Sequence, residues 1–178
     1  MEQEFIRDYV MYAAIFGILS FVWFGWAQEN PRQSWRKYLG IGSAIALIVS
    51  AVGVYFSVTN WSESSALSEM DAFTMYLIVF YAQLIIGAIV AFILIRKKLG
   101  DYVAPWIGLL VGIHFIFLVD VFEDPSLYLL AAIMIIIAVI SPWLAKKFEV
   151  GNSTITGIGN GVILLCFAIL GLVRYLLM

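Results

Sequence analysis

The chain has 178 residues, of which 63% are hydrophobic and only 12% are charged, and its formal net charge is −2. Because a soluble domain carries roughly 25% charged residues, this composition excludes a soluble globular protein. The apolar segments are long and continuous, as helices that cross about 30 Å of hydrocarbon require, whereas the strands of a membrane barrel alternate. The sequence therefore predicts an all-α, polytopic transmembrane helical bundle.

The hydrophobic segments predict a single membrane domain, 1–178, with six spans. We place these spans at about 9–27, 38–58, 73–95, 102–122, 127–145 and 154–178. The second span is rich in Gly, Ala and Ser, which let helices approach closely in lipid, so we expect it to pack in the interior of the bundle. The fifth span is the most uniformly apolar, and we expect much of its surface to face lipid.

Positive charge gathers in alternate connections between the spans. Lys and Arg occur in 31–37, 96–101 and 146–153, whereas the other two connections hold acids and neither Lys nor Arg. Short connections rich in Lys and Arg stay in the cytoplasm, so these three are predicted to be cytoplasmic and both termini to lie outside. The prediction is a multi-pass protein of the cell (cytoplasmic) membrane.

Polar residues inside the spans are few, and the fourth span holds the only histidine of the chain, His114. At about 1.5 Å per residue, His114 lies ~12 Å below the outer boundary, and Gln83 of the third span lies ~15 Å below it. In one interpretation, the imidazole and the amide satisfy each other in an interhelical hydrogen bond. In the other, they line a polar site that opens outward and binds a ligand.

Two charged residues are predicted near the outer ends of their spans, Asp120 in the fourth and Arg174 in the sixth. These spans run in the same direction, so the two charges lie at the same edge of the membrane. They either pair with each other or reach water separately. Asp120 follows His114 by six residues, or about 240° around a helix, so a His–Asp catalytic pair within this span is not expected.

Glycines mark two further features. Gly108 and Gly112 form a small-xxx-small step beside His114, which lets another helix pack closely. The sixth span opens with glycines around Asn160, and these either pack against a neighbour or loosen the helix so that it lines a cavity. The candidate ligand-binding residues are His114, Gln83, Asp120, Arg174 and Asn160.

The fourth span also carries a resemblance to a known group of proteins. Gly112-x-His114-Phe115, followed by Phe122-x-x-Pro125, resembles a segment of small uncharacterised six-span bacterial membrane proteins. The similarity covers about 20 residues, and Asp120 departs from it, because that group is more apolar there. The resemblance implies a six-span fold and attention to His114, and it implies no activity.

These features favour an integral membrane protein that binds or transports a small molecule at an outward-facing polar site. The alternative is a structural or regulatory membrane protein that binds a partner protein or lipid, and an intramembrane enzyme acting on lipid ranks last. One histidine and one cysteine cannot build a bis-histidine haem site or a multi-histidine zinc site, so we expect no metal and no cofactor. Nucleic acid is not an expected partner; the lipid bilayer is, and a homo-oligomer or a membrane-protein partner stays open.

Overall fold

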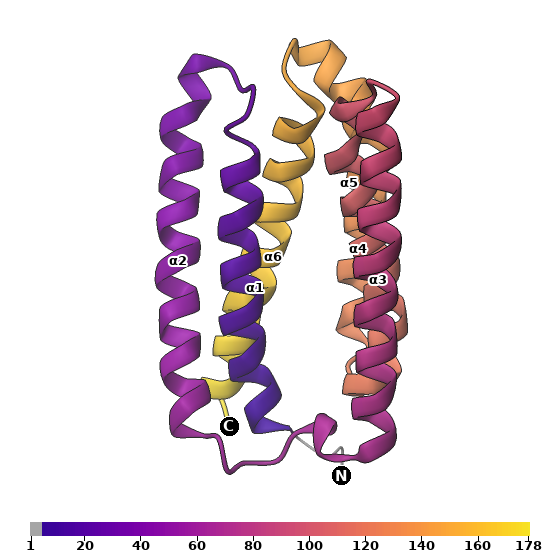
Figure 1. Ribbon diagram of the computed structural model, residues 1–178. Helices are drawn as coiled ribbons and strands as arrows, with labels where there is room; N and C mark the ends of the chain where they lie inside the picture. Colours follow the sequence, from indigo (N-terminus) through magenta and orange to yellow (C-terminus); the bar gives the residue numbers. More distant parts are fainter. Residues whose placement is uncertain (1–4) are drawn as a thin grey trace.

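The computed structural model describes residues 5–178 and contains six long helices (Figure 1). They are α1 (Ile6–Trp26), α2 (Arg36–Thr59), α3 (Met70–Arg96), α4 (Val103–Phe122), α5 (Ser126–Phe148) and α6 (Asn152–Leu176). Short 3₁₀ turns at Gln33–Trp35, Ala66–Ser68 and Gly100–Tyr102 precede α2, α3 and α4. All six helices are long and apolar enough to cross a membrane. The predicted all-α, six-span bundle is confirmed, and the protein is a multi-pass integral membrane protein.

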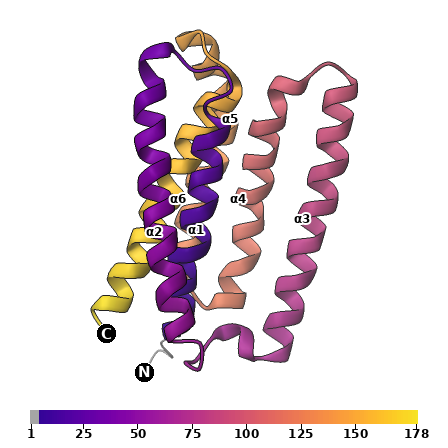
Figure 2. The same cartoon turned by 60° about the vertical axis from the view of Figure 1, so that its left-hand side comes forward.

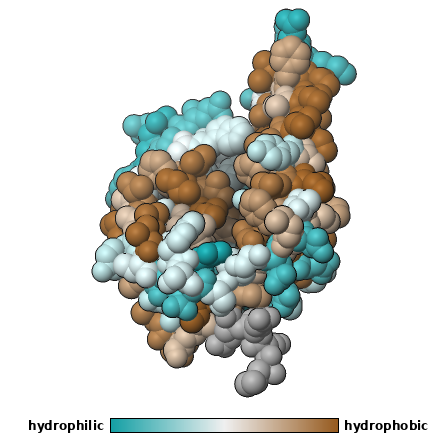
Figure 3. Space-filling view, turned by 60° about the horizontal axis from the view of Figure 1, so that its bottom comes forward, coloured by the Kyte–Doolittle hydropathy of each residue, from teal (hydrophilic) through white to brown (hydrophobic). Residues whose placement is uncertain are grey.

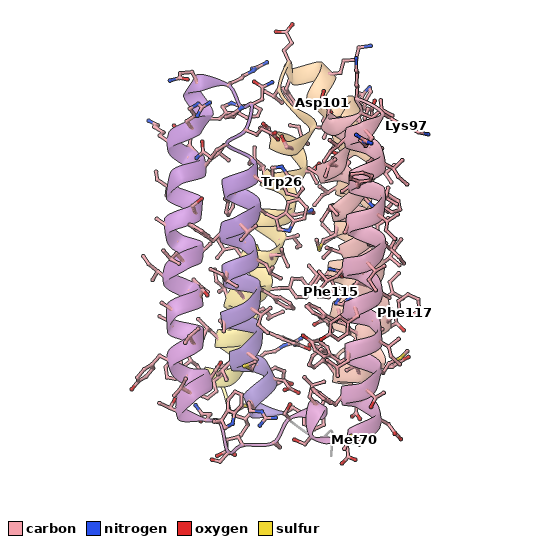
Figure 4. All side chains as sticks on the ribbon, viewed as in Figure 1. Trp26, Met70, Lys97, Asp101, Phe115 and Phe117 are labelled. Atoms are coloured by element: carbon pink, nitrogen blue, oxygen red, sulfur yellow. The ribbon has the colours of Figure 1, made fainter. Side chains whose placement is uncertain are left out.

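The two ends of the bundle carry opposite charge. The connections 27–35, 97–102 and 149–151, with the helix ends beside them, form what we call the basic end. It holds eight of the ten Lys and Arg residues: Arg32, Arg36, Lys37, Arg96, Lys97, Lys98, Lys146 and Lys147. The connections 60–69 and 123–125, with the start of α1 and the end of α6, form the acidic end. Figure 4 shows Lys97 and Asp101 at the basic end and Met70 at the acidic end.

The helices form two groups that meet through α6. In the first group α1 packs against α2 and α6; in the second α4 packs against α5, and α3 packs against α4. Contacts of α5 and α4 with α6 join the groups. Figures 1 and 2 show α1 and α3 standing apart, and in Figure 2 α4 stands between them.

The helix α2 lies at the edge of the bundle, so its predicted interior position is wrong. Its small residues do pack closely, but on one face only, against α1. The Ser50 hydroxyl donates a hydrogen bond of 2.8 Å to the Ala14 carbonyl. A side chain at Gly53 would collide with the backbone of Ala13 and Ala14. Lipid chains are as apolar as a protein interior, so the remaining faces of α2 need no protein cover.

Glycine, serine and threonine residues also bring α6 into close contact with α1 and α5. The Ser20 hydroxyl of α1 donates to the Gly161 carbonyl at 2.6 Å, and the Thr156 hydroxyl donates to Ser141 of α5 at 2.9 Å. At Gly157 an added Cβ would lie 2.5 Å from the Trp23 carbonyl oxygen. The glycines at the start of α6 therefore serve close packing, and α6 is helical from Asn152 onward.

Candidate functional site

A cavity at the acidic end has a volume of about 690 Å³. The start of α1, the connection between α4 and α5, and the end of α6 surround it. Figure 3 views this end and shows a hollow near its middle, with strongly hydrophilic atoms beside it. Among residues 5–178, four charged residues line the cavity: Asp8, Glu123, Asp124 and Arg174.

Arg174 pairs with Asp124 in this cavity. Its Nη1 donates to Asp124 Oδ2 at 2.7 Å, and this is the one ion pair within residues 5–178. The other carboxylate oxygen of Asp124 accepts a hydrogen bond of 2.9 Å from the N–H of Ser126, the first residue of α5. Asp120 is exposed and does not line the cavity, so the interpretation of an Asp120–Arg174 pair is wrong.

Asp8 is the most deeply buried carboxyl group of the cavity, with 4% of its surface exposed. Its Oδ1 accepts a hydrogen bond of 2.6 Å from the Ser65 hydroxyl, and its Oδ2 accepts one of 2.8 Å from the Ala66 N–H. Both carboxyl oxygens of Asp8 therefore have hydrogen-bond donors, and the residue lies in the first turn of α1. No Lys or Arg nitrogen lies within 4.0 Å of Asp8 among the described residues.

Aromatic rings form the deep part of the cavity. Tyr9, Tyr12 and Phe122 line it, and the Tyr12 ring meets Phe122 edge to face at a centroid distance of 5.6 Å. The Tyr12 side chain is 6% exposed, and no described protein group hydrogen-bonds its hydroxyl. The Arg174 guanidinium lies 5.4 Å from the centre of the Tyr9 ring. The cavity thus combines aromatic faces with carboxylates.

The charges in this cavity do not balance. Three carboxyl groups and one guanidinium give a formal charge of −2, and the guanidinium is already paired with Asp124. Carboxylates beside aromatic faces attract organic cations through charge and through the negative face of each ring. The arrangement can therefore hold an ammonium group and disfavours an anion.

His114 and Gln83 lie elsewhere, in a second cavity of about 280 Å³ between α1, α3 and α4. They also line a shallower groove of about 300 Å³ on the outer side of α3 and α4. They share these spaces but do not hydrogen-bond each other: Gln83 Oε1 and His114 Nδ1 are both buried with no protein partner. Cavities are present at Gln83 and His114, but Asp120 and Arg174 do not line them.

Asn160 does not line any of these three cavities. It is fully buried where α6 meets α4, and a Cβ placed on Gly108 would lie 2.8 Å from its Nδ2. The small-xxx-small step works as predicted, since Gly108 faces α6 and Gly112 faces Ile135 of α5. Asn160 is therefore a residue of the packed interior, away from the acidic-end cavity.

The sequence interpretation missed Asp8, Tyr12 and Asp124, which are central to the acidic-end cavity. A span drawn from residue 9 left Asp8 outside the first helix, and Asp124 seemed part of a solvated turn. Within the described chain no three His, Cys, Asp or Glu side chains gather as a metal site would require. No family model, curated protein or solved structure matches the chain, so its function has to be argued from this geometry alone.

Proposed function

We propose that this integral membrane protein binds a small organic cation, an amine or a quaternary ammonium, in the acidic-end cavity. The observation that carries the proposal is the cavity of about 690 Å³ itself, with its unbalanced carboxylates beside Tyr9, Tyr12 and Phe122. Aromatic and carboxylate groups together are the usual means of recognising ammonium groups in proteins. The acidic residues around the cavity also raise the local concentration of cations.

The proposal includes an orientation. The basic connections are the ones that the positive-inside rule assigns to the cytoplasm, so the acidic end is proposed to face outside. The ligand then enters from the outer solution. Tyr12 and Phe122 close the inner end of the cavity, so transport would require these two rings to separate.

The test is a thermal-unfolding titration of the detergent-purified protein with tetramethylammonium chloride, compared with sodium chloride at the same ionic strength. A ligand that binds the folded state raises the melting temperature, and a hundredfold excess over Kd stabilises by about 2.7 kcal/mol. We expect tetramethylammonium to stabilise beyond sodium. Equal shifts with both salts would overturn the proposal.

Two matched variants test whether the stabilisation by tetramethylammonium comes from binding in the acidic-end cavity. Glu123→Gln removes an exposed carboxylate of the cavity, and Asp120→Asn removes an exposed carboxylate near the same end of α4 that does not line it. Glu123→Gln is expected to weaken tetramethylammonium binding, and Asp120→Asn to leave it near the wild-type value. Equal weakening by both variants would assign the effect to general surface charge instead.

The partner-binding alternative is favoured by one observation, the exposure of α3. Gly87 is its single buried residue, and most of its other residues are exposed, so that lipid or another protein can cover them. A mass measurement of the protein in lipid nanodiscs separates the two functions. A stable oligomer that dissociates on substitution of α3 residues, without any ammonium binding, would favour the structural function.

A further inference from the structure

The cavity between α1, α3 and α4 is separate in chemistry from the acidic-end cavity. Its walls are aromatic and aliphatic, with Phe16, Trp23, Phe80 and Phe115 among them, and no Asp, Glu, Lys or Arg lines it. Figure 4 shows Phe115 pointing into the space between α1 and the α3–α4 pair, whereas Phe117 points away from the bundle. A ligand bound here has to be uncharged, because an unpaired charge in such surroundings is very costly.

This cavity is reached from the bilayer. Its walls belong to α1 and α3, which pack against different neighbours, and its floor is α4 (Figure 2). Ile15 on α1 and Leu84 on α3 stand at its edges with 40% and 49% of their surfaces exposed. Lipid-soluble molecules can therefore enter sideways between these helices. Tyr12 and Phe122 line both cavities and form the boundary between this one and the acidic end.

Two polar atoms in these walls lack protein partners. Gln83 Oε1 of α3 is an acceptor and is buried without a hydrogen bond. His114 Nδ1 is likewise buried without a partner among the described residues. A neutral imidazole has one donor and one acceptor nitrogen, so Nδ1 can accept a hydrogen bond when Nε2 holds the proton. The cavity therefore contains two unpartnered polar atoms that can accept a hydrogen bond from a ligand.

We infer that this cavity is a second, lateral binding site for an uncharged, lipid-soluble aromatic compound with a hydroxyl group, which donates a hydrogen bond to Gln83 or His114. The aromatic walls suit a flat ring, since aromatic pairs stabilise each other beyond the area that they bury. The site does not depend on the cation site, because no charged residue contributes to it.

The experiment compares 1-naphthol with 1-methoxynaphthalene, which has the same ring system and no donor. Apparent dissociation constants are measured by thermal-unfolding titration of the full-length protein in detergent. One net hydrogen bond predicts that 1-naphthol binds roughly 2- to 12-fold more tightly. Equal binding of the two compounds, or no binding of either, overturns the inference.

The variants Gln83→Met and His114→Phe each remove one acceptor, on different helices. Each is expected to reduce the preference for 1-naphthol and to leave 1-methoxynaphthalene binding in place. Thr74→Val is the control, because it removes an exposed hydroxyl of α3 that does not line the cavity. Partitioning into detergent is the same for all variants and cancels in the comparison. A preference that survives in both Gln83→Met and His114→Phe overturns the inference.

A second readout separates binding from a structural function. If Gln83 and His114 stabilised the contact between α3 and α4 through a hydrogen bond with each other, Gln83→Met would lower the melting temperature of the ligand-free protein. Gln83 Oε1 has no hydrogen-bond partner among the described residues. Its replacement by the apolar end of a methionine is therefore expected to leave the melting temperature unchanged or to raise it. Glu123→Gln is expected to leave 1-naphthol binding unchanged, which distinguishes this site from the cation site.

Discussion

The Arg174–Asp124 pair holds the end of α6 to the turn between α4 and α5, and its strength can be estimated from its surroundings. The contact of 2.7 Å is a charge-assisted hydrogen bond, and such bonds contribute about 1.5–3 kcal/mol when sheltered. The Asp124 side chain is 10% exposed, but that of Arg174 is 30% exposed, so solvent screens the pair toward the 0–1 kcal/mol of surface pairs. We expect a coupling free energy of about 1–2 kcal/mol.

A double-mutant cycle measures this coupling. Arg174→Gln, Asp124→Asn and the double variant are unfolded by SDS titration in mixed micelles, and the free energy of unfolding is followed by circular dichroism. A parallel cycle of Arg174→Gln with Asp120→Asn is the control, since Asp120 is exposed and forms no ion pair with any residue from 5 to 178. Residues without a shared contact add within about 0.3–0.5 kcal/mol, so the control coupling is expected near zero.

The single substitutions are expected to be unequal. Asp124→Asn disturbs both the Arg174 contact and the bond from the Ser126 N–H, whereas Arg174→Gln leaves the second bond in place. Asp124→Asn should therefore lower the free energy of unfolding more. A coupling below about 0.5 kcal/mol for Arg174 with Asp124, or an equal coupling with Asp120, would show that this reasoning is wrong.

Two further predictions concern packing and orientation. Gly53→Ala should destabilise the protein by about 1–3 kcal/mol in the same SDS titration, because its Cβ would collide with the α1 backbone, whereas Gly40→Ala meets nothing within 4 Å and should change little. In a Cys166→Ser background, a membrane-impermeant maleimide applied to intact cells should label Ser62→Cys of the acidic end and spare Gln33→Cys of the basic end; the reverse pattern would invert the proposed orientation.

Hydropathy and charge predicted the six helices correctly but could not predict their neighbours. The glycines and serines of α2 correctly indicated a close helix contact, yet one face is enough for that contact, and Gly53 and Ser50 supply it against α1. The other faces of α2 meet lipid, which is as apolar as protein, so the sequence carries no sign of which faces are covered. For the same reason the sequence did not indicate that α3, and not α5, has the fewest buried residues.

The sequence interpretation paired Arg174 with Asp120 instead of Asp124 because it could not predict the backbone conformation at the end of α4. If α4 continued, Asp124 would lie one turn beyond Asp120 on the same face. Instead Glu123 adopts the left-handed conformation, with φ of 51°, and ends the helix. Asp124 then turns toward α6 while Asp120 stays exposed. A helix drawn correctly to Phe122 was therefore not enough, because the pairing depends on one backbone angle that no hydropathy pattern reports.

The position of each polar group along the helices determines whether it can bind a charged or an uncharged ligand. A cation that leaves water has to find compensating charge, and the acidic end provides it, because Asp8 and Glu123 border an open cavity there. Halfway along α3 and α4 the polar groups are Gln83 and His114, which offer hydrogen bonds without fixed charge. The proposed cation site and the inferred lateral site thus require different ligands. Since Tyr12 and Phe122 border both cavities, substitution of either residue is expected to alter both sites.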